Sequence, residues 1–309
     1  MQKQGLVIKS TGKWYKIRLE NGDIVDGQVR GKFRIEGIKT TNPIAVGDKV
    51  TLEMENDTSG IVTEIADRKN YIIRKSVNLS KQAHIIAANV DQAIILVTVS
   101  KPQTSYGFID RFLVTAEAYQ IPVVILINKM DAYNEKDLIK AEEIDVCYSA
   151  AGYDVRKISA LQSESLTEIK SLFKDKISML GGHSGAGKST LLNAISPGLD
   201  IKVQQVSDSH NKGQHTTTFA EMHELKNGGF VIDTPGIKGF GLIDIEKQEL
   251  HMLFPEMREL LPDCKFHNCQ HISEPKCAVL EALQRGKLNE KRYKSYLSMH
   301  EDEGQSPYR

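Results

Sequence analysis

One segment of the chain has the residue types and spacing of a loop that binds phosphate groups. Its pattern is Gly-x-x-x-x-Gly-Lys-Ser, and its members are Gly182, His183, Ser184, Gly185, Ala186, Gly187, Lys188 and Ser189. Glycines let backbone N–H groups converge on phosphate oxygens, and the dipole of a following helix adds positive charge. In such loops the lysine bridges the β- and γ-phosphates and the serine binds Mg²⁺. An apolar run precedes this segment and a helix-forming run follows it, which is the context that the motif requires.

A second motif reads Asn128-Lys129-Met130-Asp131 and follows the apolar run 123–127. It therefore lies at the carboxyl end of a predicted strand, where open α/β sheets bind their ligands. The Asp131 carboxylate can accept hydrogen bonds from N1–H and the exocyclic amine of guanine, which adenine does not present in that arrangement. We therefore expect a guanine nucleotide. Ser159 and Ala160 resemble the backbone element that contacts guanine O6, although Ser-Ala is a weak signal by itself.

A third motif, Asp-Thr-Pro-Gly, runs from Asp233 to Gly236 after the apolar run 230–232. Asp233 takes the position of a carboxylate that holds the magnesium shell, and the N–H of Gly236 can approach the γ-phosphate. In an ordinary GTP-binding domain the phosphate loop comes first and Asn-Lys-x-Asp comes last. Here the guanine motif comes first, so the chain predicts a GTPase core in rotated order. The segment that senses the γ-phosphate then runs almost directly into a C-terminal module.

A polar stretch, 207–218, lies between the phosphate loop and Asp233 and ends in three threonines. We expect a switch that becomes ordered when one of these threonines, with Thr218 as the candidate, binds Mg²⁺ beside the γ-phosphate. A plain surface loop is the alternative. Residues 237–239 include no glutamine that could orient water, so we expect slow intrinsic hydrolysis. His215 is the candidate catalytic residue together with Lys188, although His215 can equally be a surface histidine of the loop.

Three cysteines and a histidine cluster near the C-terminus with the spacing Cys-x4-Cys-x-His-x5-Cys. They are Cys264, Cys269, His271 and Cys277. Three thiolates and one imidazole complete a closed tetrahedral zinc shell, which predicts one structural Zn²⁺. His267 could replace His271, and buried free cysteines are the alternative. Cys147 stands apart from the cluster, and we expect it in the core.

The composition indicates a multidomain protein of the cytoplasm. The chain has 309 residues, with 40 Lys plus Arg and 40 Asp plus Glu, so nucleic-acid binding must come from local patches. Its longest apolar runs are far shorter than the roughly 20 residues that span a bilayer, and no secretion signal is visible. The cysteine pattern does not resemble a disulfide scaffold, which favours a reducing compartment. We expect no membrane association and a monomer.

We expect three domains, with boundaries at 1–68, 69–245 and 246–309. Short apolar stretches and turn signals in the first predict an all-β barrel of the oligonucleotide-binding (OB) type. Alternation places Tyr15, Ile17 and Leu19 on one face and Trp14, Lys16 and Arg18 on the other, where they would suit RNA. Residues 1–40 carry nine Lys or Arg against four acids, although a charged outer face is common on such barrels.

The second segment alternates strands and helices, which predicts an α/β core with a mainly parallel sheet. The expected strands are 91–99, 123–127, 154–158, 177–180 and 230–233, and the expected helices are 109–119, 137–144 and one from Lys188. Residues 68–88 have no clear period and are interpreted as a basic linker, with a plain solvated surface as the alternative. The third segment is expected to form helices around the Cys/His cluster, with a basic helix or pair of helices at 278–299 and a frayed tail at 303–309.

Together, the basic barrel, the rotated motifs, the Gly-x-His-Thr-Thr-Thr stretch and the Cys/His cluster resemble the RsgA (YjeQ) family over almost the whole chain. These are bacterial circularly permuted GTPases that depend on the small ribosomal subunit. The resemblance implies an OB-fold, a permuted GTPase core and a zinc-binding domain that act late in small-subunit assembly, with the subunit and its rRNA as partners. It implies that residues 128–131 read guanine, that Gly181 to Ser189 hold phosphates, that the cluster binds zinc and that His215 is the switch histidine.

Two other functions compete with this expectation. A permuted GTPase that serves the large ribosomal subunit would share the motif order, but the barrel and the Cys/His cluster argue against it. An RNA-binding scaffold, in which GTP only sets affinity, would share every motif and differ in showing no stimulated hydrolysis.

Overall fold

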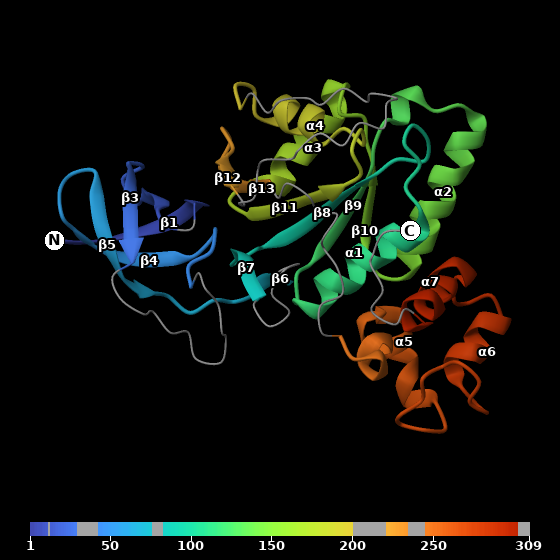
Figure 1. The fold of residues 1–309 in the computed structure, drawn as a ribbon. Coiled ribbons are helices and arrows are strands. Elements are labelled where there is room, and N and C mark those ends of the chain that lie inside the picture. The colour runs from blue at the N-terminus through green and yellow to red at the C-terminus, as the bar shows by residue number, and fades with distance from the viewer. Residues whose placement is uncertain (12, 30–42, 76–82, 200–220, 234–244, 302–309) are drawn as a thin grey trace, which may run out of the picture.

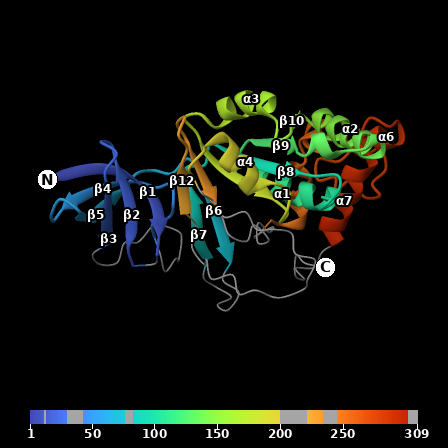
Figure 2. The same cartoon turned by 90° about the horizontal axis from the view of Figure 1, so that it is seen from above.

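The computed structural model describes residues 1–11, 13–29, 43–75, 83–199, 221–233 and 245–301. It has three parts in a row (Figures 1 and 2): a β-barrel at one end, an α/β core in the middle and a group of helices at the other end. The fold class expected from the sequence is confirmed in all three parts.

The barrel is a closed sheet with five strands, in the order β1-β2-β3-β5-β4 and back to β1. The strands are β1 (Gln2–Ser10), β2 (Tyr15–Leu19), β3 (Ile24–Val29), β4 (Lys49–Met54) and β5 (Ser59–Ile65). The predicted alternation along β2 is confirmed, because Tyr15, Ile17 and Leu19 are all buried in the barrel core. Trp14, just before β2, is 46% exposed.

The middle part is an α/β core with a mainly parallel sheet, as predicted, and helices lie on both faces of the sheet. Its parallel strands run in the order β10-β9-β8-β11-β13 and an antiparallel strand, β12, follows. They are β8 (Gln92–Val97), β9 (Val123–Ile127), β10 (Asp154–Lys157), β11 (Ile177–Gly182), β12 (Glu221–Glu224) and β13 (Phe230–Asp233). Strand β12 is not predicted by the sequence pattern.

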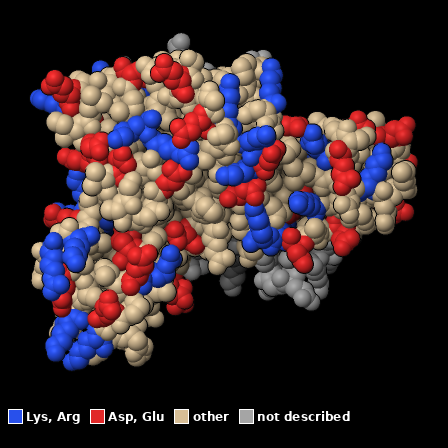
Figure 3. Space-filling view, turned by 180° about the vertical axis from the view of Figure 1, so that it is seen from behind, with Lys and Arg blue, Asp and Glu red and all other residues tan. Residues whose placement is uncertain are grey.

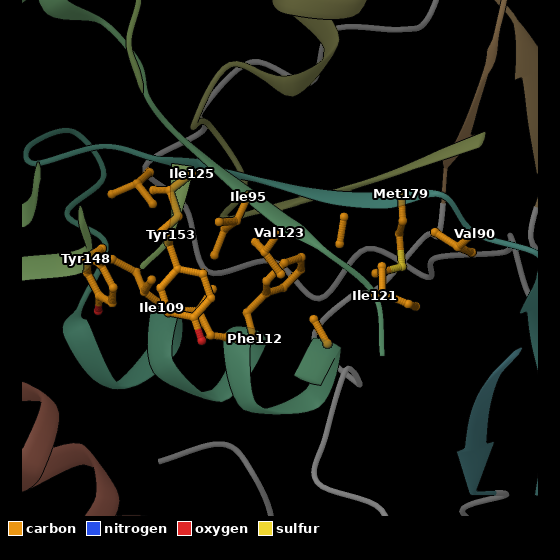
Figure 4. Close-up of a cluster of buried hydrophobic side chains, with 14 of the residues drawn as sticks. Val90, Ile95, Ile109, Phe112, Ile121, Val123, Ile125, Tyr148, Tyr153 and Met179 are labelled. Atoms are coloured by element: carbon orange, nitrogen blue, oxygen red, sulfur yellow. The ribbon is translucent and has the colours of Figure 1, made fainter. Parts of the chain in front are cut away.

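Two helices cover each face of this sheet. In Figure 1, α1 (Tyr106–Ala118) and α2 (Glu135–Ala150) lie on one side, and α3 (Ser163–Phe173) and α4 (Lys188–Ile195) lie on the other. The core on the α1 side is shown in Figure 4, where Ile109 and Phe112 point from the helix toward the sheet residues Ile95 and Val123. Cys147 is buried in this core, as expected. Helix α3 is not predicted by the sequence pattern.

The barrel continues the sheet of the core. Strand β1 pairs with β12, at the register Lys9 to Glu221. The same edge is held by ion pairs of Lys9 with Glu221 (2.9 Å) and of Arg18 with Glu224 (2.8 Å). Arg18, which the sequence placed on a face suited to RNA, is therefore engaged in joining two parts of the protein.

The interpretation of residues 68–88 as a linker is wrong for much of that segment. Strands β6 (Tyr71–Lys75) and β7 (Ala83–Ala88) form an antiparallel pair. Before them, the guanidinium of Arg68 donates to both carboxylate oxygens of Asp48 at 2.6 Å, and the Asp48 side chain is fully buried. The described part of this segment is thus folded and connects the barrel to the core.

The C-terminal part is helical, as predicted. It consists of the 3₁₀ helices η3 (Lys247–Leu253) and η4 (Leu261–Asp263) and the α-helices α5 (Pro255–Leu260), α6 (Ala278–Gln284) and α7 (Glu290–Glu301). The run expected to be a basic helix or pair of helices is a pair, α6 and α7. Arg292 of α7 is not on the surface, since its side chain is 1% exposed. The tail at 303–309 lies outside the described residues.

Among the residues that the structure describes, no helix is both long enough and apolar enough to cross a bilayer.

Candidate nucleotide site and metal centre

The loops that carry the first two motifs meet at one edge of the sheet, because the parallel strands β8, β9, β10 and β11 all end there. Asn128 ties these loops together. Its side-chain amide donates to the carbonyl of Ala186 in the phosphate loop at 2.9 Å, and its side-chain oxygen accepts from the N–H of Ala160 at 3.0 Å. Asn128 is 2% exposed, so both ends of its amide are used within the protein.

The loop between β11 and α4 has the backbone that a phosphate loop needs. Gly187 has a φ of +101°, and a Cβ there would lie 2.5 Å from Nδ2 of Asn128. This close approach requires glycine, because any side chain would displace the Asn128 amide. The Lys188 ammonium donates to the carbonyls of Gly182 (2.7 Å) and His183 (2.9 Å), so it lies over the loop. Ser189 follows in the first turn of α4.

The guanine motif forms a short turn after β9. Lys129 has a left-handed backbone (φ 71°), and Met130–Ala132 form the 3₁₀ helix η1. The Lys129 ammonium donates to the carbonyl of Lys101 at 2.7 Å, and burial lowers its pKa. The Asp131 side chain is exposed, so its carboxylate is accessible to a ligand.

Tyr133 is a residue of this site that the sequence analysis missed. Its hydroxyl donates to the carbonyl of Asn128 at 2.5 Å and accepts from the N–H of Val99 at 3.0 Å. It therefore joins the loop after β8 to the guanine motif. The only signal in the sequence is a tyrosine soon after Asp131, which does not indicate where its hydroxyl lies.

The Ser-Ala element follows β10 at the same edge. Ser159 is 1% exposed, and its hydroxyl accepts from the N–H of Leu161 at 3.2 Å. Ala160 is held by Asn128 as described above. Ser159 and Ala160 thus lie beside the loops that carry the two stronger motifs.

Asp233 is the last residue of β13, which pairs in parallel with β11. The two strands that lead to the phosphate loop and to the third motif are therefore neighbours. His215, Thr218 and Gly236 lie outside the described residues, as does the predicted switch 207–218.

The Cys/His cluster is assembled in the C-terminal part. One ligand atom from each of Cys264, Cys269, His271 and Cys277 lies within 4.8 Å of the others. The Nδ1 atom of His271 is 3.3 Å from Sγ of Cys277 and 3.7 Å from Sγ of Cys264. Three thiol groups and an imidazole at this separation fit a tetrahedral metal shell.

Several backbone contacts hold the cluster in shape. The Glu274 carboxylate accepts from the N–H groups of Gln270 (2.7 Å) and Ile272 (2.8 Å), and the hydroxyl of Tyr293 donates to the carbonyl of His271 (2.7 Å). Burial lowers the pKa of His271 to about 4, so its imidazole is neutral, the form that binds metal. These features support a metal site at the cluster.

Comparisons with known proteins agree with this arrangement. The RsgA GTPase family model matches residues 65–243, and the RsgA N-terminal domain model matches residues 4–62. A protein of Bacteroides fragilis called small ribosomal subunit biogenesis GTPase RsgA is 50% identical over 306 residues, which are 99% of each chain. Its namesake in Christiangramia forsetii is 51% identical over 303 residues, covering 97% of this chain and 96% of that protein.

Two solved structures share the whole fold. The crystal structure of YjeQ from Thermotoga maritima has a TM-score of 0.80 and 38% identity, covering 97% of this chain and 98% of that one. The structure of YloQ, described as a circularly permuted GTPase, has a TM-score of 0.75 and 34% identity, covering 97% and 94%. With its guanine motif and its phosphate loop in rotated order and at one edge of the sheet, the chain belongs to the RsgA family of circularly permuted GTPases.

Proposed function

We propose that this protein is a GTPase that binds the small ribosomal subunit, acts late in its assembly and hydrolyses GTP to GDP and phosphate when the subunit stimulates it. The observation that carries the proposal is the position of Asn128, which joins the phosphate loop to the Ser-Ala element. The relatives named as small-subunit biogenesis GTPases support the choice of partner.

We assign the steps of the reaction to residues of the site. Asp131 recognises guanine, with Lys129, Met130, Ser159 and Ala160 around the base. The loop from Gly181 to Ser189 holds the phosphates, with Lys188 bridging the β- and γ-phosphates. Mg²⁺, when bound, neutralises charge that develops on the phosphates. Ser189, Asp233 and Thr218 would hold it, Gly236 would contact the γ-phosphate, and His215 would help to position the attacking water.

The metal at the Cys/His cluster is proposed to be one structural Zn²⁺. Three thiolates and one imidazole are a preferred zinc donor set, and four protein ligands leave no position open for chemistry. The zinc would stabilise the C-terminal domain, here taken as residues 246–309 beside the proposed domains 1–68 and 69–245.

Contact with rRNA is also part of the proposal. Lys9, Lys16 and Arg18 of the barrel each pair with an acid, so we assign RNA contact to Trp14 and Lys13, which are both exposed. On the face of the molecule in Figure 3, Lys and Arg are interspersed with Asp and Glu. RNA binding through a local patch fits this surface better than attraction over a wide basic face. We further propose that the protein works as a monomer in the cytoplasm.

The proposal is tested by measuring GTP hydrolysis by the protein alone, with small subunits and with large subunits. Stimulation by the small subunit only is expected. Lys188→Ala should abolish turnover, and Lys174→Ala, which removes an exposed lysine of the same domain, should not. Stimulation by the large subunit would identify a different partner. Nucleotide-dependent RNA binding without stimulated hydrolysis would favour the RNA-binding scaffold instead.

A further inference from the structure

An aromatic ring outside the three motifs contacts the phosphate loop. The ring of Phe108, in the first turn of α1, stacks on the ring of His183, with centroids 3.9 Å apart and an angle of 27° between the planes. The phosphate-loop pattern leaves the residue at position 183 free. The contact therefore comes from this chain's own sequence and is not required by the motif.

The same helix supports the start of the loop through Phe112. A Cβ placed on Gly181 would lie 2.3 Å from the Phe112 ring, so this ring lies directly against the loop backbone. Phe112 is 2% exposed and, as Figure 4 shows, points from α1 into the core beneath the sheet. Two successive turns of α1 thus contact two positions of the phosphate-binding segment.

The opposite side of α1 packs against the C-terminal domain. Asp110 accepts from the guanidinium of Arg292 of α7 at 2.7 Å, and the two side chains are 0% and 1% exposed. Val114, one turn further along α1, is part of the hydrophobic core of the C-terminal domain. The helix therefore lies between the Cys/His domain and the phosphate loop, in direct contact with both.

We propose that Phe108 is a positioning residue for the phosphate loop, and that α1 transmits the packing of the C-terminal domain to that loop. The stack restricts His183, so the loop loses less conformational freedom when it closes around phosphates. Arg292 keeps α1 in place through Asp110. This inference rests on the proposed nucleotide site and adds a static connection that is separate from the predicted switch.

The first test compares nucleotide affinity in Phe108→Ala, Phe108→Tyr and the unmodified full-length protein, by calorimetric titration with GDP and Mg²⁺. Phe108→Ala should weaken GDP binding by about two- to tenfold, the effect of losing one aromatic pair. Phe108→Tyr keeps an aromatic ring in the stack and should bind GDP as tightly as the unmodified protein. Ile139→Ala, which truncates a side chain 62% exposed on α2, is the matched control and should bind GDP normally.

The outcomes separate this inference from the proposed function. If the unmodified protein does not bind GDP, the proposed function fails. If it does bind and Phe108→Ala binds equally well, only the role of Phe108 is overturned. In steady-state hydrolysis with small subunits, KM should rise more than kcat falls, because the stack acts on binding; a loss confined to kcat would contradict a positioning role.

The connection to the C-terminal domain is tested by a double-mutant cycle between Phe108→Ala and Asp110→Asn. The asparagine keeps the size of the side chain and can still accept from Tyr148, so this variant is expected to fold. Asp110→Asn should weaken GDP binding, and its effect should be smaller when Phe108 is already alanine. An unchanged affinity in Asp110→Asn, or independent effects in the double variant, would show that α1 does not carry the coupling. Arg285→Met, which removes an exposed ion pair with Glu281 inside the C-terminal part, is the control and should bind GDP normally.

Discussion

Arg292 of the C-terminal helix and Asp110 of the GTPase core form an ion pair of 2.7 Å that is almost completely shielded from water. The same guanidinium donates to both oxygens of the Glu256 carboxylate, at 2.7 and 2.9 Å, and lies 4.7 Å from the centre of the Phe254 ring. Asp110 also accepts from the hydroxyl of Tyr148 at 2.9 Å. One arginine thus connects two carboxylates from two parts of the protein.

Removing this arginine should destabilise the protein strongly. Arg292→Met leaves the Asp110 carboxylate buried without its cation, which costs about 3–5 kcal/mol in the free energy of unfolding. Urea unfolding followed by circular dichroism measures the change. Arg258→Met should cost less than about 1 kcal/mol, because its pair with Glu117 is exposed. Equal effects of the two variants would mean that the buried network contributes no more than a surface pair.

Asn128→Ala should weaken guanine-nucleotide binding and lower stability together. The change leaves the Ala186 carbonyl and the Ala160 N–H without their partner, at about 1–3 kcal/mol for each buried group. Titration with GDP and thermal unfolding give the two quantities. Asn134→Ala is the control, because it removes only the cap of α2, where Asn134 accepts from the N–H of Asp137. That variant should lose about 1 kcal/mol of stability and keep its nucleotide affinity.

Asp131→Asn should shift the base preference from guanine toward xanthine. Asparagine offers an amide donor where guanine needs an acceptor, whereas the carbonyl of xanthine can accept from it. The loss of a charged hydrogen bond predicts that GDP affinity falls by about ten- to a hundredfold. Competition between GDP and XDP measures the preference. Glu135→Gln changes a nearby exposed acid and should leave the base preference unchanged. An unaltered preference in Asp131→Asn would show that Asp131 does not contact the base.

Metal removal should destabilise the C-terminal part, which contains the Cys/His cluster. Elemental analysis of the purified protein is expected to give about one zinc per chain, the stoichiometry of one four-ligand site. Cys277→Ser should lose the metal and lower the thermal stability, because a structural site contributes its binding free energy to folding. Cys147→Ser is the matched control. This variant changes a buried thiol in the core between α1, α2 and the sheet, and burial raises the pKa of that thiol to about 12. It should keep the zinc. Full metal content in Cys277→Ser would exclude the cluster as the site.

The sequence was most informative where function depends on a few adjacent residues. The phosphate loop, the guanine motif and the Cys/His spacing could be read directly, because each chemistry requires those residue types at short, fixed separations. The parallel strands β9 and β13 were also predicted, since strands buried on both faces form continuous apolar runs. Strands β6 and β7 were missed, because their short pairing has no clear period.

The tertiary structure decided which charged and aromatic residues act together across the chain. Arg18 and Arg292 are both cations in basic stretches of the sequence, yet Arg18 joins the barrel to β12 and Arg292 is buried between α1 and α5. Their partners lie far away in sequence, so local pattern carries no signal for them. The sequence by itself determined the nucleotide chemistry, the rotated order and the candidate metal ligands. Only the folded chain, by bringing distant segments into contact, placed Asn128 between two loops and Phe108 on the phosphate loop.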